Sequence, residues 1–143
     1  MRCDQLMTRE PVCCLPNDNV IKAAQIMKRA DIGLIPIIDT EETKMIVGIL
    51  SDRDMTMNVI AESRDPQTTT VEEVMTRKVV SCQVSDDIQK AMDLMMEYQL
   101  RRIPVVDKSN KIVGIISQAD VATRLNQPGT TAEVVKEISQ PRT

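Results

Sequence analysis

Two serine–aspartate pairs are the residues of this sequence whose types and spacing could do chemistry. Ser51-x-x-Asp54 and Ser117-x-x-Asp120 each follow an apolar run, where a strand is expected to end and a helix to begin. Such a pair caps a helix, because Ser suits the N-cap and an acidic residue suits the first turn. It can also bind a sugar phosphate, since backbone N–H groups and the Ser hydroxyl donate to phosphate while the carboxylate accepts from both ribose hydroxyls. Because the pattern occurs twice, we interpret it as a ligand site as well as a cap.

The segments around the two pairs are copies of one another. Met7-Thr8-Arg9 recurs as Met75-Thr76-Arg77, and the block 46–54 recurs as 112–120. The spacing between the blocks changes only in the polar stretch 40–44, where a turn can absorb it, so the match indicates duplication. A copy of roughly 60 residues buries little surface by itself, and we therefore expect the halves to pack together as a pseudo-twofold unit.

Each copy predicts the same order of elements: an extended segment, a helix, two strands and a second helix. The predicted N-caps of the first helices lie near 17–18 and 85–86, and the last helices are expected over 55–62 and from 121. The strands are continuously apolar, which predicts that both of their faces are covered. Thr130-x-x-Glu133 predicts a capping box that opens a C-terminal helix through Ile138. The fold class is therefore α+β, with two βαββα repeats; the predicted parts are 1–62 (repeat 1), 63–70 (linker), 71–127 (repeat 2) and 128–143 (tail with a short helix).

Composition narrows the functional classes. The chain has 143 residues, a formal net charge of −3 and no basic run, which argues against a nucleic-acid binder. It has no apolar stretch of membrane-spanning length and no signal-peptide core at its start, so we expect a cytoplasmic protein without a membrane partner. It contains no His, the commonest general acid or base, and we therefore expect no enzymatic activity.

The four cysteines do not form a metal-binding pattern. They stand at 3, 13, 14 and 82, without a C-x-x-C pair and without a His to complete a zinc site. Cys14 and Cys82 are repeat equivalents in apolar segments, and we expect both to be small buried side chains. A redox role of Cys13 and an intermolecular disulfide at Cys3 stay open.

The combined pattern resembles a tandem pair of CBS domains, named after cystathionine β-synthase and often called a Bateman module. The resemblance covers roughly residues 4–126 and is carried by the Met-Thr-Arg segments, the stretch 101–107 and the two Gly-x-x-Ser-x-x-Asp endings. It implies two βαββα units packed through their sheets in a small stand-alone protein, with two clefts for adenosyl ligands such as AMP, ADP, ATP, S-adenosylmethionine or NADH. It also implies a regulatory role, a disc-like homodimer, no required cofactor and an effector protein on another chain.

Carried onto this sequence, the resemblance assigns roles to individual residues. Ser51 and Ser117 would contact phosphate, and Asp54 and Asp120 the ribose. Arg53, Arg101 and Arg102 are the cations expected to meet phosphate, whereas Gly33 and Leu34 stand where the second copy has its arginine pair. A phosphate chain should therefore prefer one cleft. The apolar walls for adenine would come from Ile35, Pro36, Ile103, Pro104, Cys14 and Cys82.

Two further classes of function stay open from the residues. A structural module could dimerise and dock on a partner with empty clefts, which methionine-rich helices would serve equally well. A small enzyme is disfavoured by the missing His and the few nucleophile–base pairs. The leading hypothesis is a sensor that binds adenine nucleotides without turning them over.

Overall fold

Two compact units make up the chain in the computed structural model, which describes residues 1–141. The first-repeat unit contains Pro11–Val79 together with Asn110–Ile112. The second-repeat unit contains Met1–Glu10, Val80–Ser109 and the chain from Val113 onward. Each unit thus combines segments that are distant in sequence, and the first ten residues of the chain complete the repeat that comes last.

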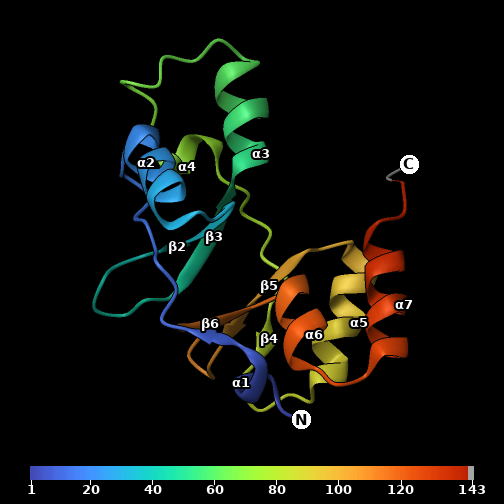
Figure 1. Cartoon of the computed structure of the whole chain (residues 1–143). Helices are drawn as coiled ribbons and strands as arrows, with labels where there is room; N and C mark the ends of the chain where they lie inside the picture. The colour runs from blue at the N-terminus through green and yellow to red at the C-terminus, as the bar shows by residue number, and fades with distance from the viewer. Residues whose placement is uncertain (142–143) are drawn as a thin grey trace. The chain divides into compact units, whose positions relative to one another are not determined.

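The first-repeat unit consists of a helix, a hairpin and a helical connection (Figure 1). Its elements are α2 (Val20–Ala30), β2 (Leu34–Ile38), β3 (Ile46–Ser51), α3 (Asp52–Met55), the π-helical turn η1 (Thr56–Ile60) and α4 (Val71–Val74). β2 and β3 are antiparallel, with Leu34 opposite Ser51 and Pro36 opposite Ile49. Single bridges extend this sheet on both sides, from Cys14 to Ile37 and from Ile49 to Thr76.

The second-repeat unit follows the same plan, with two further short strands and one more helix. Its elements are α1 (Cys3–Leu6), β1 (Thr8–Arg9), β4 (Cys82–Gln83), α5 (Ile88–Tyr98), β5 (Arg102–Val106), β6 (Ile112–Ser117), α6 (Gln118–Arg124) and α7 (Pro128–Ile138). The strands form one sheet in the order β1-β6-β5-β4. Thr8 lies antiparallel to Ile115, and Cys82 lies parallel to Val105. The α+β class and the strand–helix–strand–strand–helix order of both repeats are confirmed.

The helices α2 and α5 begin and end through equivalent side chains. Asn19 and Asp87 accept hydrogen bonds from the backbone N–H groups two residues later, at 2.8 and 2.9 Å. The predicted caps near 17–18 and 85–86 were therefore wrong by one or two residues. Asp18 and Asp86 instead accept the N–H groups of Leu15 and Gln83, closing the turn before each helix. Both helices stop at residues with positive φ, Asp31 and Gln99.

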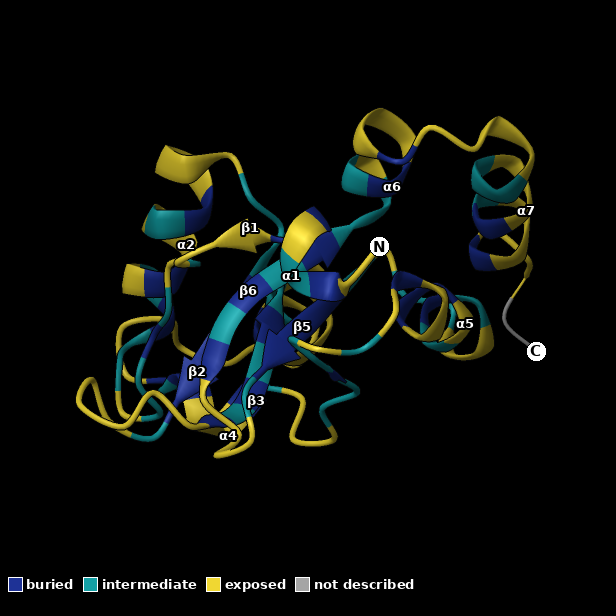
Figure 2. Cartoon of the chain, turned by 90° about the horizontal axis from the view of Figure 1, so that it is seen from below, coloured by how far each residue is buried: buried dark blue, intermediate teal, exposed yellow. Residues whose placement is uncertain are grey.

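Each unit has its own apolar core. β2 and β5 are buried on both faces after their first residue, as the continuous apolar sequences predict. β3 and β6 alternate between buried and half-buried residues, so the prediction of two covered faces was wrong for them. Figure 2 shows buried residues along β5 and on part of α5 and α7.

Two glycines allow the Met-Thr-Arg segments to approach the sheets. A Cβ atom built on Gly114 would lie 2.5 Å from Met7 Sδ and 2.9 Å from the Thr8 carbonyl oxygen. One built on Gly48 would lie 2.6 Å from Met75 Sδ and 3.1 Å from the Thr76 carbonyl oxygen. A side chain would collide at both places, which explains why glycine precedes each serine–aspartate pair.

The helices after the two pairs differ from their predicted limits. α3 and α6 start directly after Ser51 and Ser117, about one turn earlier than predicted, because the serines are the N-caps. α7 starts at Pro128 with Gln127 as its N-cap residue, so the predicted capping box of Thr130 and Glu133 was wrong. Proline suits the first helical position, where no intrahelical N–H bond is lost. Within residues 1–141, the helices are too short or too polar for any to cross a membrane.

Candidate ligand site

Both serine–aspartate pairs form reciprocal capping boxes. The Asp120 N–H donates to Ser117 Oγ at 3.0 Å, and the Ser117 N–H donates to Asp120 Oδ2 at 2.9 Å. Ser51 and Asp54 make the same two bonds at the same distances. We call these the first corner (Ser51–Asp54) and the second corner (Ser117–Asp120). The interpretation of the pairs as helix caps is confirmed.

The capping bonds leave part of each side chain available. Each serine oxygen accepts a hydrogen bond in the cap, so its hydroxyl proton can still be donated to another acceptor. Each aspartate uses Oδ2 in the cap and has a second carboxylate oxygen. In the first corner the Thr76 hydroxyl occupies this carboxylate, lying 3.2 Å from Asp54 Oδ1 and 3.4 Å from Oδ2. The caps therefore leave one hydroxyl proton and one carboxylate oxygen of each pair outside the capping bonds.

A hollow of about 470 Å³ lies beside Ser117 of the second corner, and Asp120 does not line it. It is lined by Arg101, Arg102, Ser117, Gln118, Ala119 and Ser139. Arg102 is half-buried at the start of β5, and Arg101 precedes it on the surface. The Gln118 N–H donates to the Arg101 carbonyl at 2.7 Å, which fixes the arginine pair beside the start of α6. The structure thus brings together Ser117 and both predicted arginines, two cations with a hydroxyl donor.

The first-repeat unit has a smaller hollow with a different charge. It measures about 300 Å³ and is lined by Asp52, Arg53, Thr56 and Met57. Arg53 was a predicted site residue, but Ser51 and Asp54 do not line this hollow. The Asp52 N–H donates to the Gly33 carbonyl at 2.9 Å, the same bond that Gln118 makes to Arg101. A neutral glycine and an acidic residue therefore stand where the second-repeat unit has an arginine and a glutamine.

The residues predicted as adenine walls belong to the cores of their units. Ile35, Pro36 and Cys14 are buried in the first-repeat unit, and Ile103, Pro104 and Cys82 in the second-repeat unit. Neither hollow is lined by any of them. The Cys14 N–H donates to the Pro36 carbonyl at 3.1 Å, so this segment pairs with β2 as part of the sheet. The assignment of these six residues to adenine stays a prediction.

The two cysteines of the first-repeat unit are held as thiols. Burial, and to a lesser extent the nearby Asp18, raise the pKa of Cys14 to about 11, although Lys22 acts to lower it. Burial also raises the pKa of Cys13. The expectation that Cys14 and Cys82 are small buried side chains is confirmed, since both are almost wholly inaccessible.

Sequence reasoning missed several residues that line the hollows or contact a corner. Asp52 and Gln118 are unequal repeat equivalents, so their difference was visible in the aligned copies. Thr76 lies in the repeated Met-Thr-Arg segment, but its bond to Asp54 depends on how the chain folds back. Ser139 follows α7, outside both repeats, and the sequence offered no signal for it.

These features define a tandem pair of α+β repeats, each ending in a capped serine–aspartate corner. The model of the CBS domain family matches residues 3–60 and 71–127. The chain therefore belongs to the CBS domain family and carries two copies of the domain. It is 34% identical over 133 residues to the CBS domain-containing protein YhcV of Bacillus subtilis (strain 168), covering 93% of this chain and 91% of the relative.

Solved structures of CBS proteins share the fold. Hypoxic Response Protein I, solved with two coordinated zinc ions, has a TM-score of 0.79 at 30% identity, covering 87% of this chain and 99% of that one. The CBS domain pair of protein MJ0100, solved in complex with 5-methylthioadenosine and S-adenosyl-L-methionine, has a TM-score of 0.75 at 26% identity, covering 85% of this chain and 93% of that one. Among residues 1–141 of the present chain, no three His, Cys, Asp or Glu side chains cluster as metal ligands.

Proposed function

We propose that this protein is a regulatory module that binds a phosphorylated adenosyl compound, such as AMP, ADP or ATP, at its second corner. The observation that carries the proposal is the hollow of about 470 Å³ in which Arg101, Arg102 and Ser117 meet. Arginine presents several donors in a planar fork and stays charged, which suits phosphate oxygens. The related MJ0100 domain pair, solved with two adenosyl compounds, supports the choice of adenosine as the remainder of the ligand.

The capping geometry suggests how sugar and phosphate would be held. Ser117 would donate its free hydroxyl proton to a phosphate oxygen, because its oxygen already accepts the Asp120 N–H. Asp120 would accept a ribose hydroxyl on the carboxylate oxygen that the cap does not use. The ligand would bind without turnover. Its adenine base would contact Ile103, Pro104 and Cys82, and these buried side chains would have to become accessible at the edge of the sheet.

The first corner would accept a less anionic ligand, if the same chemistry applies. Asp52 places a carboxylate in the adjoining hollow, which offsets the charge of Arg53. Asp54 would bind ribose only if the Thr76 hydroxyl moved away from the Asp54 carboxylate or shared this carboxylate with the ribose. The base would contact Ile35, Pro36 and Cys14. We therefore propose that the two corners differ in affinity and that the arginine pair selects the charged phosphate chain.

Ligand occupancy would be reported to a separate effector protein. A ligand shifts a conformational equilibrium only by its difference in affinity for the two states. The geometry of the second corner must therefore differ between the state that the ligand favours and the other state. The effector would lie on another chain in the cytoplasm, and the module would act as a homodimer, as the family resemblance implies.

Isothermal titration calorimetry with AMP and ATP tests the proposal. Arg102→Gln should weaken ATP binding about tenfold or more, since a hydrogen bond to a charged group contributes about 1.5–3 kcal/mol. Asp120→Ala should weaken AMP and ATP alike, because it removes a ribose contact. Arg53→Gln and Asp54→Ala are the matched changes at the first corner and should affect ATP less. Absence of wild-type binding at about millimolar ligand would refute the proposal.

A ligand-free interaction module is the second candidate function. Met57 and Ile60, three residues apart on η1, are 46% and 70% exposed, and two neighbouring apolar side chains would suit a protein contact. A thermal-shift screen of adenosyl compounds separates the two functions. A nucleotide-binding module predicts a selective rise in melting temperature, whereas an interaction module predicts none.

A further inference from the structure

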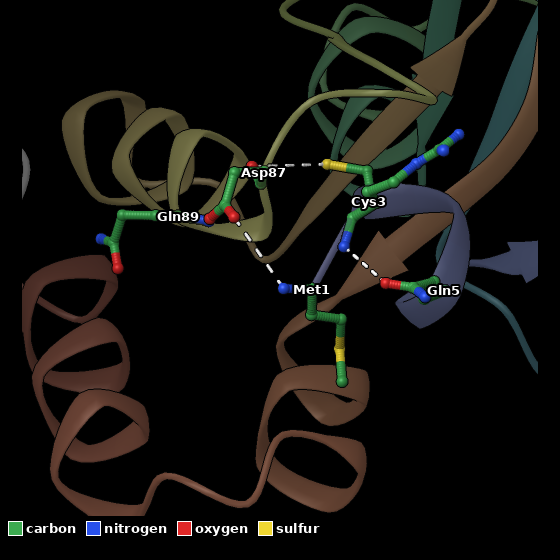
Figure 3. Close-up of polar contacts among 6 residues, drawn as sticks. Met1, Cys3, Gln5, Asp87 and Gln89 are labelled. Carbon is green, nitrogen blue, oxygen red and sulfur yellow. Dashed lines mark hydrogen bonds and ion pairs between the residues drawn. The ribbon is translucent and has the colours of Figure 1, made fainter.

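Two cysteines from distant parts of the sequence meet in the core of the second-repeat unit. Cys3 lies in α1 and Cys82 begins β4, and their relative accessibilities are 0% and 2%. Both belong to the same buried core cluster, and each thiol shifts the pKa of the other. Cys3 Sγ also lies 3.9 Å from the Asp87 carbonyl oxygen, as Figure 3 shows, and Cys82 Sγ lies 3.8 Å from that of Pro104. The pair is thus a contact between the N-terminal segment (residues 1–10) and the body of the unit.

Backbone bonds hold the N-terminal segment in register beside the thiols. The Cys3 N–H donates to the Asp86 carbonyl at 2.9 Å, and the Asp4 N–H donates to the Val84 carbonyl at 3.2 Å. The terminal ammonium of Met1 lies 3.8 Å from Asp87 Oδ2. These contacts fix the position of Cys3 along the chain segment that follows Cys82.

The first-repeat unit shows what the fold itself requires at this place. Val71 stands where the second-repeat unit has Cys3, and its N–H donates to the Asp18 carbonyl at 2.8 Å in the equivalent bond. Cys14 is the equivalent of Cys82 and shares a core cluster with Val71. An apolar residue therefore satisfies the packing, and a thiol at residue 3 adds chemistry that the packing does not demand.

We propose that Cys3 and Cys82 are a reversible dithiol–disulfide pair that fastens the N-terminal segment to the second-repeat unit when hydrogen peroxide is present. The proposal does not rest on the ligand at the second corner, although Cys82 is also one of the residues expected to contact the base of that ligand. The Cys3 sulfur would attack one peroxide oxygen, breaking the O–O bond, forming a sulfenic acid and releasing hydroxide, which takes up the thiol proton as water. The Cys82 sulfur would then attack the Cys3 sulfur, forming the S–S bond and expelling a second water. Two electrons pass from the thiols to peroxide.

The surroundings make Cys3 the attacking sulfur. The hydrogen bond from the Cys82 thiol lowers the pKa of Cys3 below its ordinary value, although burial, Asp86 and Asp87 oppose this. The hydrogen bond to Cys3 and burial raise the pKa of Cys82. Peroxide would reach Cys3 through local opening of the N-terminal segment, since a segment with only a four-residue helix and a two-residue strand opens at lower free-energy cost than the whole unit.

The disulfide would limit that opening. β1 follows α1 directly and pairs with β6, and β6 ends at Ser117. A disulfide at residue 3 would keep Thr8 and Arg9 paired with β6. We expect amide hydrogen exchange in β1 to slow by about tenfold or more on oxidation, because opening would no longer free the whole segment.

Peptide mapping of the full chain after treatment with hydrogen peroxide tests the proposal. The protein is oxidised, free thiols are blocked with an alkylating agent, and non-reduced digests are analysed by mass spectrometry. The expected main product is a monomer in which the peptides containing Cys3 and Cys82 are linked, and dithiothreitol should restore both thiols. Linkage between Cys13 and Cys14, intermolecular disulfides or irreversible oxidation as the main product would overturn it. Recovery of Cys3 and Cys82 in alkylated form would do the same.

Two variants provide matched controls. Cys3→Val introduces the valine that the first-repeat unit has at the equivalent position, Val71. It should abolish both the disulfide linkage and the slowed amide hydrogen exchange in β1. Val71→Cys places a thiol beside Cys14 in the equivalent position and should create a second linkage, between residues 14 and 71. A wild-type linkage with unchanged exchange in β1 would overturn the fastening, and the wild-type map tests the disulfide even if a variant does not fold.

Discussion

The second-repeat unit has a helix that the first-repeat unit lacks, and this changes the residues that each copy needs. α7 lies beside α5 and α6 (Figure 1) and contributes the buried side chains Val134 and Ile138 to the core. Met92 on α5 is 1% exposed and packs in the same cluster. Its repeat equivalent on α2 is Ala24, which is exposed. The duplicated plan thus sets the backbone, while an added element outside the repeats decides which helix face is apolar.

The same difference extends to the ligand sites. Both corners have the same capping bonds, at 2.9 and 3.0 Å in each. Their surroundings differ, because Ser139 and the arginine pair line the second hollow while Asp52 and Arg53 line the first. Conserved hydrogen bonding in a duplicated protein therefore does not imply equal ligand preference.

A reciprocal exchange between the two helices should give the largest effect on stability. Met92→Ala should lower the free energy of unfolding by about 2–4 kcal/mol, because it removes a buried side chain and leaves a cavity. Ala24→Met should change it by less than about 0.5 kcal/mol, because the site is exposed. Urea unfolding followed by circular dichroism measures both. Equal effects would mean that α7 does not cover α5 in solution.

The two glycines should rank next. Gly114→Ala should cost about 2–3 kcal/mol and Gly48→Ala about 1–2 kcal/mol, because the new Cβ meets backbone more closely at Gly114, at 2.9 Å against 3.1 Å. The same unfolding experiment applies. Gly129→Ala in α7 is the control, since nothing lies within 4 Å of its added Cβ. It should raise stability by up to about 1 kcal/mol, and a loss there would contradict the steric explanation.

The smallest effect concerns the loop in which the copies differ in length. The Thr43 hydroxyl donates to Asp39 and, together with the backbone N–H groups of Thr40 and Met45, lowers the pKa of Asp39 below its ordinary 3.8. Because the folded pKa is depressed, the stabilisation is present above pH 3.8 and is lost as the pH falls through the folded pKa. Thr43→Val should raise this pKa, as measured by NMR titration of the carboxyl carbon. Thr123→Val in α6 should leave it unchanged.

Repetition in the sequence predicted much of the fold, because equivalent residues face equivalent surroundings. The hairpins, the buried strands β2 and β5, and the capping role of Ser51 and Ser117 followed from local patterns. Which segments belong to each unit did not follow from the sequence. Cys3 pairs with a segment of the second half of the chain and Val71 with one of the first half, and hydropathy does not show which segments pair. Ser139 was missed for a related reason: it reaches the second hollow through the packing of α7.

The position of residues 1–10 in the second-repeat unit also has a consequence for biosynthesis. The first-repeat unit needs no residue beyond Ile112, so it can form while the rest of the chain is still being made. The second-repeat unit must recruit Met1–Glu10, which are translated before the whole first-repeat unit, once its own strands have been made. Until then this segment has no sheet to join. Long sequence separation slows folding, so we expect the pairing of residues 1–10 with the strands of the second-repeat unit to be a late folding step.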